Sequence, residues 1–148
     1  LWGKASGCFY DVNLRPPFTT SDLVLESLAV AAIVKANGDE LGAICNWAGI
    51  DSKDKKKAAE ELLGKYDIAA LAVTEGGEGA WVMTQEGFFE GPGVQVQVAD
   101  TVGAGDAFFA AVIHGFCNNA EWRDTLARAN RRGAYVASRY GATPDMPD

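Results

Sequence analysis

Two glycines and an aspartate at positions 103, 105 and 106 form the pattern with the clearest chemical use in this sequence. They lie in the stretch Asp100-Thr101-Val102-Gly103-Ala104-Gly105-Asp106-Ala107-Phe108, which precedes an apolar segment of helical character. Glycines just before a helix leave backbone N–H groups uncovered, and together with the helix dipole these groups bind an anion such as phosphate. An acid beside such a pocket suits a base that deprotonates a hydroxyl group. The pattern therefore indicates phosphoryl transfer.

The same residues also have a purely structural interpretation. An aspartate in the first turn of a helix commonly stabilises the helix end, and Gly-x-Gly is commonly just a turn. Other glycine motifs are excluded. The P-loop pattern Gly-x-x-x-x-Gly-Lys-Ser/Thr does not occur, and the third glycine of a dinucleotide motif would fall on Phe108. Local chemistry alone leaves the anion-binding and the structural interpretations open.

The stretch from Asp100 to Phe108 resembles the second signature of the ribokinase-like (PfkB) carbohydrate kinases. Three upstream segments resemble the family motifs Asp-x-Asn-x-Arg-Pro, Lys-x-Asn-x-x-Glu and Thr-x-Gly-x-x-Gly, in the order in which the family has them. These segments are Asp11-Val12-Asn13-Leu14-Arg15-Pro16, Lys35-Ala36-Asn37-Gly38-Asp39-Glu40-Leu41 and Thr74-Glu75-Gly76-Gly77-Glu78-Gly79-Ala80. Four motifs in the family's order argue against coincidence.

The resemblance runs from about Phe9 to Pro147 and implies a ribokinase-like α/β fold, in which three α/β/α layers contain a mainly parallel central sheet. Residues 1–148 would form the carboxy-terminal, nucleotide-binding and catalytic half of such a kinase. The amino-terminal, sugar-binding half and its lid would be absent. A length of 148 residues suits one domain but is short for a complete kinase of this type. The chain also begins Leu1-Trp2-Gly3-Lys4 without a methionine, so we expect a fragment.

The resemblance implies catalytic roles around the glycine loop. Asp106 would be the base that takes a proton from a sugar hydroxyl. The backbone N–H groups of Gly103, Ala104 and Gly105 would hold the charge on the transferred phosphoryl group. Glycine is expected there because a side chain would block the close approach. Thr101 is expected among the nucleotide contacts.

Further nucleotide contacts follow from the resemblance. Thr74, Gly76 and Gly79 would lie along the phosphates, although without the resemblance they form an ordinary hairpin turn. Asn130 resembles a family position beside the adenine. The pair Arg131-Arg132 that follows it replaces the small residues usual in the family, which leaves the shape of the adenine pocket open.

Metal and substrate contacts are expected at two strand ends. Asn37 and Glu40 match positions that organise the magnesium–phosphate region, with Glu40 acting through water because magnesium gives up its waters reluctantly. Without the resemblance they are a helix start with an exposed glutamate. Asp11, Asn13 and Arg15 are expected to face the substrate or the phosphates, although polar residues at a strand end can also merely leave the sheet. Arg15 is the strongest candidate, because its fork of donors suits phosphate or carboxylate.

The activity that the resemblance implies is transfer of the γ-phosphoryl group of MgATP to a sugar hydroxyl. The run Asp-x-Asn-Leu-Arg-Pro-Pro-Phe is most similar to fructokinases and related hexose or keto-deoxy-gluconate kinases. The presence of Asp106 argues against vitamin-precursor kinases of this fold, which tend to replace that acid. The alternative is a truncated, non-catalytic nucleotide-binding remnant. The sugar, and the need for a monovalent cation near Asp100, stay open.

Composition limits the partners and the compartment. With 13 basic and 20 acidic residues and no basic stripe interleaved with aromatics, the chain is not expected to bind nucleic acid. No apolar run is long enough to span a membrane. Three cysteines without a Cys-x-x-Cys pattern indicate core residues in a reducing, cytoplasmic setting. The apolar sheet edge left by a missing half would favour a homo-oligomer.

Two hydrophobic periodicities alternate along the chain, which is typical of α/β architecture. Strands are expected at 7–12, 33–35, 68–74, 79–84, 88–90 and 94–98. Helices are expected at 21–30, 39–47, 105–117 and 121–140, with a further helix that follows a cap at Ser52 and runs to Tyr66. Ligands gather at the carboxyl ends of strands in such sheets. The side chains expected along one crevice are therefore Asp11, Asn37, Thr74 and Gly103.

Overall fold

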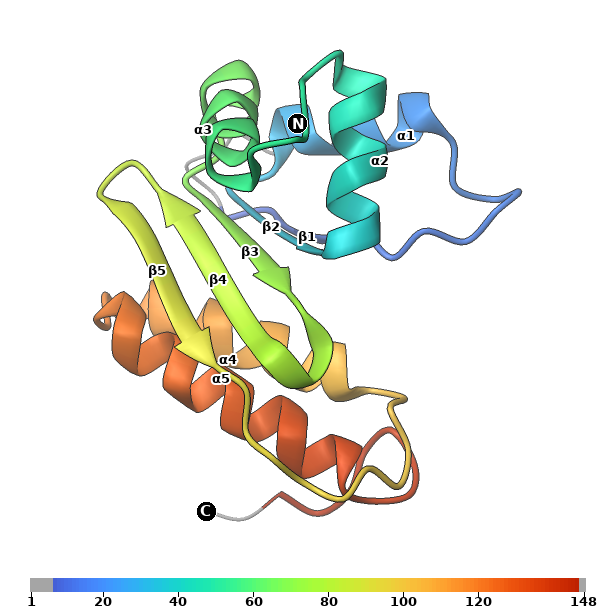
Figure 1. Cartoon of the computed structure of the whole chain (residues 1–148), viewed down its shortest axis with the longest axis vertical. Coiled ribbons are helices and arrows are strands. Elements are labelled where there is room, and N and C mark those ends of the chain that lie inside the picture. Colours follow the sequence, from blue (N-terminus) through green and yellow to red (C-terminus); the bar gives the residue numbers. More distant parts are fainter. Residues whose placement is uncertain (1–6, 147–148) are drawn as a thin grey trace. The chain divides into compact units, whose positions relative to one another are not determined.

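The computed structural model of the chain describes residues 7–146, which form both strands and helices (Figure 1). The elements are β1 (Phe9–Asp11), α1 (Ser21–Val30), β2 (Ile33–Asn37), α2 (Gly38–Ala48), α3 (Lys55–Tyr66), β3 (Ala70–Thr74), a 3-10 turn (Gly76–Glu78), β4 (Gly79–Thr84), β5 (Gly87–Pro92), α4 (Ala104–Cys117) and α5 (Trp122–Ala137). The five strands form one sheet in the order β1-β2-β3-β4-β5. Strand β2 pairs in parallel with β1 and with β3, which confirms the expected mainly parallel sheet. The expected fragment start, Leu1 to Lys4, lies outside the described residues.

The chain divides into two compact units. The first contains the residues up to Thr74 together with Val82–Phe88, and the second contains Glu75–Trp81 together with the residues from Phe89 onward. The β4–β5 hairpin therefore contributes residues to both units. Each unit is described below by itself.

Buried strand residues, apolar except for Lys35 in β2, form the core of the first unit. Residues 33–36 of β2 and 70–73 of β3 are all buried, as expected for parallel strands whose two faces are both covered. The helices contribute fully buried side chains, among them Leu28, Ile44 and Leu62. Burial of such apolar side chains is the main favourable contribution to folding.

Side chains cap the three helices of the first unit, and one of these caps differs from the expected one. Thr20 caps α1 by accepting a hydrogen bond from the Leu23 amide, and Asn37 caps α2. The cap expected at Ser52 is wrong. Asp54 takes this role for α3 because its carboxylate accepts from the amides of Lys56 and Lys57.

Small residues let α4 and α5 pack closely in the second unit. A Cβ atom added at Gly115 would lie 2.6 Å from Cγ2 of Thr125, and one added at Gly133 would lie 3.1 Å from the carbonyl oxygen of Ala104. The two helices bury Val112 and Leu126 without measurable exposure. The helix pair is therefore held by close backbone approach and by an apolar seam.

The strand expected at 94–98 is wrong. These residues carry no strand, and Val94, Val96 and Val98 are 38%, 37% and 61% exposed. Alternating residues form a strand only where a neighbouring strand satisfies their backbone groups. In the described part of the chain, no strand pairs with this segment.

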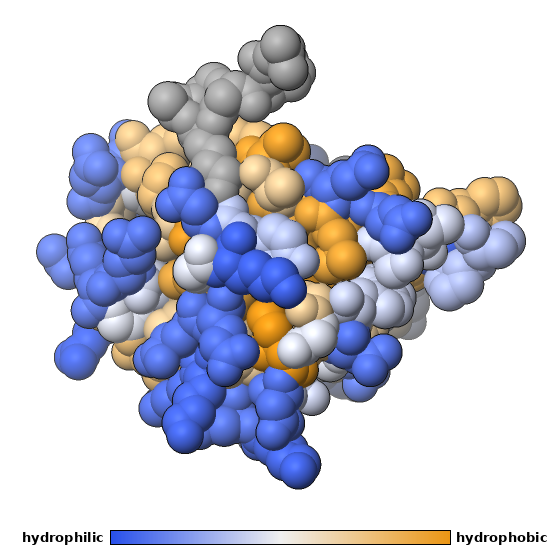
Figure 2. All heavy atoms as spheres, turned by 90° about the horizontal axis from the view of Figure 1, so that it is seen from above, coloured by the Kyte–Doolittle hydropathy of each residue, from blue (hydrophilic) through white to orange (hydrophobic). Residues whose placement is uncertain are grey.

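The cysteines differ in burial, and the helices are expected not to span a membrane. Only Cys45 is buried, whereas Cys8 is half-buried and Cys117 is exposed, so a core position is wrong for Cys117. Within residues 7–146, every helix is too short or too polar to cross a lipid bilayer. On the face drawn in Figure 2, hydrophilic side chains surround smaller apolar patches.

Replacement of Gly115 by alanine tests the close packing of α4 on α5. The added methyl group would collide with Thr125, so we expect Gly115→Ala to lower the free energy of unfolding by about 1–3 kcal/mol. Chemical denaturation followed by far-UV circular dichroism measures this change.

The matched control is Gly64→Ala in α3, where nothing lies within 4 Å of the added atom. Alanine is the better helix former, so this variant should gain about 0.5–1 kcal/mol. Equal stabilities of the two variants would contradict the packing argument.

Candidate functional site

Parallel register brings three predicted site residues to one edge of the sheet in the first unit. Asp11 lies opposite Lys35, and Asn37 lies opposite Thr74. These residues end β1, β2 and β3, so their side chains leave the sheet at its carboxyl edge. Asp11, Asn37 and Thr74 thus share the carboxyl edge of the sheet, while the crevice that we expect them to line stays a prediction. Gly103 belongs to the second unit, and its place in that crevice stays a prediction.

Asp11 is engaged by a lysine that the sequence did not assign as its partner. The Lys35 Nζ atom donates to both carboxylate oxygens of Asp11, at 2.9 and 3.0 Å. The side chains are only 9% and 18% exposed, respectively. A partly buried carboxylate needs such a partner. Asp11 therefore stabilises the strand ends, whereas Asn13 and Arg15, two and four residues further along, stay exposed.

Asn37 and Glu40 form a reciprocal capping box at the start of α2. Asn37 Oδ1 accepts from the Glu40 amide at 2.8 Å, and Glu40 Oε2 accepts from the Asn37 amide at 2.8 Å. Glu40 Oε1 also accepts from the Leu14 amide at 3.1 Å. The glutamate is 8% exposed, so the alternative of an exposed Glu40 is wrong.

The donor set around Glu40 decides what kind of magnesium site it fits. Each carboxylate oxygen of Glu40 accepts a hydrogen bond from one amide and has one lone pair left. The described residues contain no group of three acidic, histidine or cysteine side chains suited to a metal ion. Such a set fits the waters of a hydrated Mg²⁺ rather than a direct ligand shell. That Glu40 acts on magnesium through water stays a prediction.

The predicted nucleotide loop is held by its own backbone. After Thr74, the Glu75 amide donates to the carbonyl oxygen of Gly79 at 2.8 Å. Gly76 and Gly79 have φ values of 59° and 113°, which only glycine adopts readily. A side chain at Gly79 would also collide with the backbone of Gly91. The two glycines are thus required by the turn itself.

The glycine loop before α4 leaves helical amides without a side-chain cap. Gly103 is the N-cap residue at φ 80°, and no side chain caps this helix. The Ala104 amide donates to the Thr101 carbonyl oxygen at 3.2 Å, while within residues 7–146 no acceptor is recorded for the amides of Gly105 and Asp106. Uncapped first-turn amides are the groups that bind anions.

The requirement for glycine at position 103 has a reason that the sequence did not reveal. A Cβ atom there would collide with the backbone of Ala142, in the segment after α5. We expected glycine because a ligand must approach closely. In this structure the close neighbour is the chain itself.

Asp106 lies beside a cavity within the second unit. It is exposed on the first turn of α4 and, with Gly103, lines a cavity of about 580 Å³ between α4, α5 and residues 142–146. His114, Arg128 and Arg132 line the same cavity. Asp106 and Gly103 therefore border one solvent-accessible space, whereas Ala104 and Gly105 are not among its lining residues.

Asp100 connects the glycine loop to the end of α5. Its Oδ1 atom accepts from the Val102 amide at 3.0 Å and its Oδ2 atom accepts from the Gly141 amide at 3.2 Å. These two bonds, with the Val102 bond the larger contribution, lower the pKa of the Asp100 carboxyl below its ordinary value. Sequence reasoning noted Asp100 only as a possible cation neighbour and did not assign it this bracing role.

Asn130 braces β5 from within α5. Its Nδ2 atom donates to the carbonyl oxygens of Gly91 and Pro92, at 2.9 and 3.0 Å. The side chain is 8% exposed. The amide nitrogen is thus engaged in the fold, and contact with a nucleotide base stays a prediction for the remaining oxygen.

Comparison with known sequences identifies similar proteins along nearly the whole chain. Residues 2–148 match the description "pfkB family carbohydrate kinase". The chain is 31% identical to aminoimidazole riboside kinase from Salmonella typhimurium over 93% of its own length and 44% of the relative. It is also 31% identical to fructokinase-2 from Zea mays, over 97% of its own length and 46% of the relative. The chain thus spans about half the length of these relatives.

Comparison with solved structures gives the same fold. A fructokinase from Xylella fastidiosa, solved with bound ATP, superposes with a TM-score of 0.79 at 25% identity, over 94% of this chain and 48% of that one. A ribokinase from Thermotoga maritima and an E. coli protein described as "a putative Ribokinase II" superpose with TM-scores of 0.73 and 0.81. Their identities of 19% and 21% show the fold alone. The fold is therefore ribokinase-like, as expected.

Acid should weaken the connection that Asp100 makes. Because the pKa of Asp100 is lowered in the folded chain, its ionised form stabilises the fold above the ordinary aspartate pKa of about 4. That stability is lost as the pH falls through the lowered pKa. Urea denaturation between about pH 6 and about pH 2 should therefore show a steeper loss for the natural chain than for Asp100→Asn.

Asp124→Asn, at an exposed acid of α5, makes the same charge change without touching the loop and should keep the natural pH dependence. A pH dependence of Asp100→Asn that equals the natural one would contradict the bracing role.

Proposed function

The chain belongs to the pfkB family of carbohydrate kinases, and on this premise we propose that it is the carboxy-terminal, nucleotide-binding and catalytic half of an ATP-dependent sugar kinase. The observation that carries the proposal is the shared cavity at the start of α4. Asp106 and Gly103 both line it, and uncapped amides follow Gly103. A carboxylate and an anion site at one cavity are the two groups that phosphoryl transfer to a hydroxyl requires.

The proposed chemical step assigns the proton and the phosphoryl group to separate elements. The Asp106 carboxylate accepts the proton of the acceptor hydroxyl as the oxygen forms its bond to the γ-phosphorus of ATP. The bond between that phosphorus and the β,γ-bridging oxygen breaks, and ADP leaves with the electron pair. Amides of the glycine loop, with Gly103, Ala104 and Gly105 as proposed donors, hold the charge on the moving group. Because Ala104 already donates to the Thr101 carbonyl, the amides of Gly103 and Gly105 are the more readily available donors.

Nucleotide binding is proposed for the loops at the strand ends. Thr74, Gly76 and Gly79 would follow the phosphates, with Thr101 near the γ-phosphate and Asn130 near the base. This assignment is supported by the Thr-x-Gly-x-x-Gly pattern and by the glycine conformations at positions 76 and 79. Fixed backbone amides in such loops are suited to phosphate oxygens.

Magnesium is proposed as the cofactor, held through its waters by Asn37 and Glu40. When bound, it would reduce the negative charge on the phosphates. The lone pairs that remain on the Glu40 carboxylate support this proposal. A monovalent cation near Asp100 is a further possibility that the sequence raised. In this structure the carboxylate oxygens of Asp100 accept backbone amides.

The acceptor is proposed to be a small sugar or a riboside. Aminoimidazole riboside kinase and fructokinase-2 are equally similar to the chain, at 31% identity, so similarity alone does not choose between their acceptors. We assign substrate or phosphate contacts to Asn13 and Arg15, two exposed residues that follow β1, together with Asp11, the last residue of that strand.

We also propose that the protein is cytoplasmic and that the chain associates with itself.

A second function is favoured by one observation. The chain spans 44% and 46% of its two similar relatives, so walls that enclose a sugar in those proteins can lie outside the matched part. A polypeptide with the anion loop and few sugar contacts would bind nucleotide without turnover. The chain would then be a nucleotide-binding remnant.

Two measurements on the 148-residue chain distinguish these functions. Titration with ATP and Mg²⁺ by calorimetry measures binding, and an assay of ADP release with fructose or a riboside measures turnover. Binding with turnover is expected for the kinase, and binding without turnover for the remnant. The absence of nucleotide binding at millimolar ATP would contradict both.

Asp106→Asn tests the proposed base in a longer parent kinase that contains this chain. Asparagine cannot accept the hydroxyl proton, so kcat should fall by about 10²–10⁴-fold while the affinity for ATP stays nearly unchanged. Steady-state kinetics and nucleotide titration measure the two quantities. Asp124→Asn on α5 is the control for the charge change, and retained turnover in Asp106→Asn would remove this residue from its role.

A further inference from the structure

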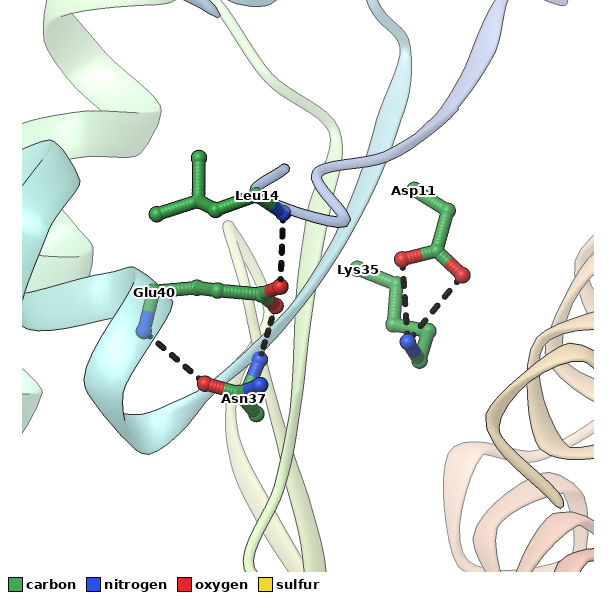
Figure 3. A network of polar contacts seen from close by, with 5 residues as sticks. All are labelled: Asp11, Leu14, Lys35, Asn37 and Glu40. Atoms are coloured by element: carbon green, nitrogen blue, oxygen red, sulfur yellow. Dashed lines mark hydrogen bonds and ion pairs between the residues drawn. The ribbon is translucent and has the colours of Figure 1, made fainter. Parts of the chain in front are cut away.

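Glu40 makes one hydrogen bond that the start of its helix does not require. Its Oε2 atom completes the capping box with the Asn37 amide. Its Oε1 atom accepts from the amide of Leu14, which lies 26 residues earlier in the chain, at 3.1 Å (Figure 3). A carboxylate that is 8% exposed carries a desolvation cost, and this second bond offsets part of it. The bond to Leu14 therefore connects α2 to the segment after β1.

The segment after β1 is fixed through its backbone at several neighbouring residues. The Val12 amide donates to the carbonyl oxygen of Lys35 at 3.0 Å, and the Leu14 amide donates to Glu40. The Arg15 amide donates to Oγ1 of Thr19 at 2.8 Å. Just before this segment, the ion pair of Asp11 with Lys35 holds the strand end (Figure 3).

The side chains between these fixed points face solvent. Asn13 and Arg15 are exposed, and Asn13 has a φ of 45°, a left-handed conformation that lets the chain turn before Leu14. Without the bond at Leu14, none of the described hydrogen bonds would hold the backbone between Val12 and Arg15. The path of the backbone into Arg15 therefore depends on Glu40 before this residue, and on the turn from Arg15 to Thr19 after it.

We propose that Glu40 is a positioning residue, which holds the Leu14 amide so that the Arg15 guanidinium is presented to an anionic group of the nucleotide or substrate. The inference rests on the proposed function only for the identity of that anion. A pre-organised guanidinium loses less conformational entropy when it binds an anion than a mobile one does. Glu40 would therefore raise anion affinity without touching the anion.

Glutamine at position 40 separates the two bonds of the carboxylate. The side chain of Gln has one oxygen acceptor, and its NH₂ group cannot accept from an amide. The capping partner Asn37 is only three residues away, whereas Leu14 is 26 residues away. Retaining the local bond orders less of the chain, so the bond to Leu14 should be the one that is lost.

Amide hydrogen exchange, followed residue by residue by NMR on the 148-residue chain, tests the first half of the proposal. In Glu40→Gln the Leu14 amide should exchange about tenfold faster or more, while the amides of β2 keep their protection. Asp39→Asn makes the same charge change one residue earlier, at an exposed side chain, and should leave Leu14 unchanged. Unchanged exchange of Leu14 in Glu40→Gln would overturn the proposal.

A second variant covers the case in which Glu40→Gln loses protection throughout the unit. Glu40→Asp keeps the negative charge at the helix start, which the helix dipole favours, but is shorter by one methylene group. It should still release Leu14, because the shortened side chain cannot reach both amides. Full protection of Leu14 in a folded Glu40→Asp chain would likewise overturn the proposal.

A double-mutant cycle with Arg15 tests the positioning role itself. The affinity for ATP is measured by calorimetry in the presence of EDTA, so that no magnesium effect enters. Glu40→Gln and Arg15→Ala should each weaken binding by about tenfold, and the double variant should be no weaker than Arg15→Ala alone.

Three outcomes decide against this role. Additive losses in the double variant would mean that Glu40 acts apart from Arg15. A loss in Glu40→Gln that occurs only with Mg²⁺ would mean that the glutamate acts through the metal. A Glu40→Gln affinity equal to the natural one would show no positioning effect. If the natural chain binds no ATP, the proposed function fails, whereas the exchange of Leu14 still decides whether Glu40 holds the loop.

Discussion

Parallel pairing of β1, β2 and β3 is the constraint on which the candidate site of the first unit depends. Backbone hydrogen bonds set the register, and the register places Asp11 opposite Lys35 and Asn37 opposite Thr74. A slip of one residue would turn every side chain of a strand to the other face. The buried residues of β2 and β3 oppose such a slip, because their side chains are close-packed on both faces and a shifted strand would have to repack both. The core therefore determines where the polar strand ends meet.

Polar side chains in both units hold loop backbone in place. Glu40 accepts the amides of Leu14 and Asn37, and Asp100 accepts those of Val102 and Gly141. Backbone groups in loops lack the regular partners of helices and strands, so side chains must satisfy them. The acids of the family motifs thus divide into residues that hold the loops and residues, such as Asp106, that face solvent. Only the second kind is available for direct chemistry.

Membership of the pfkB family indicates the kind of reaction that this geometry suits. The chain shares the pfkB family pattern along residues 2–148, and its fold matches that of a fructokinase solved with bound ATP. The structure adds what the pattern lacks, namely that Asp106 and Gly103 face one cavity and that the helix beginning at Ala104 has no side-chain cap. These features are what an anion and a hydroxyl would need at one place.

The amino-acid sequence by itself determined the α/β class, the buried strands and the four motifs. These features follow from periodicity and from side chains a few residues apart, which local patterns encode. Only the tertiary structure decided that Lys35 pairs with Asp11, that Glu40 holds Leu14, that Gly103 lies against Ala142 and that residues 94–98 form no strand. Each of these outcomes depends on whether groups 24 or more residues apart in sequence, such as those joined by the Lys35 and Glu40 bonds, meet in space. No local pattern contains that information, because packing of the whole unit sets those distances.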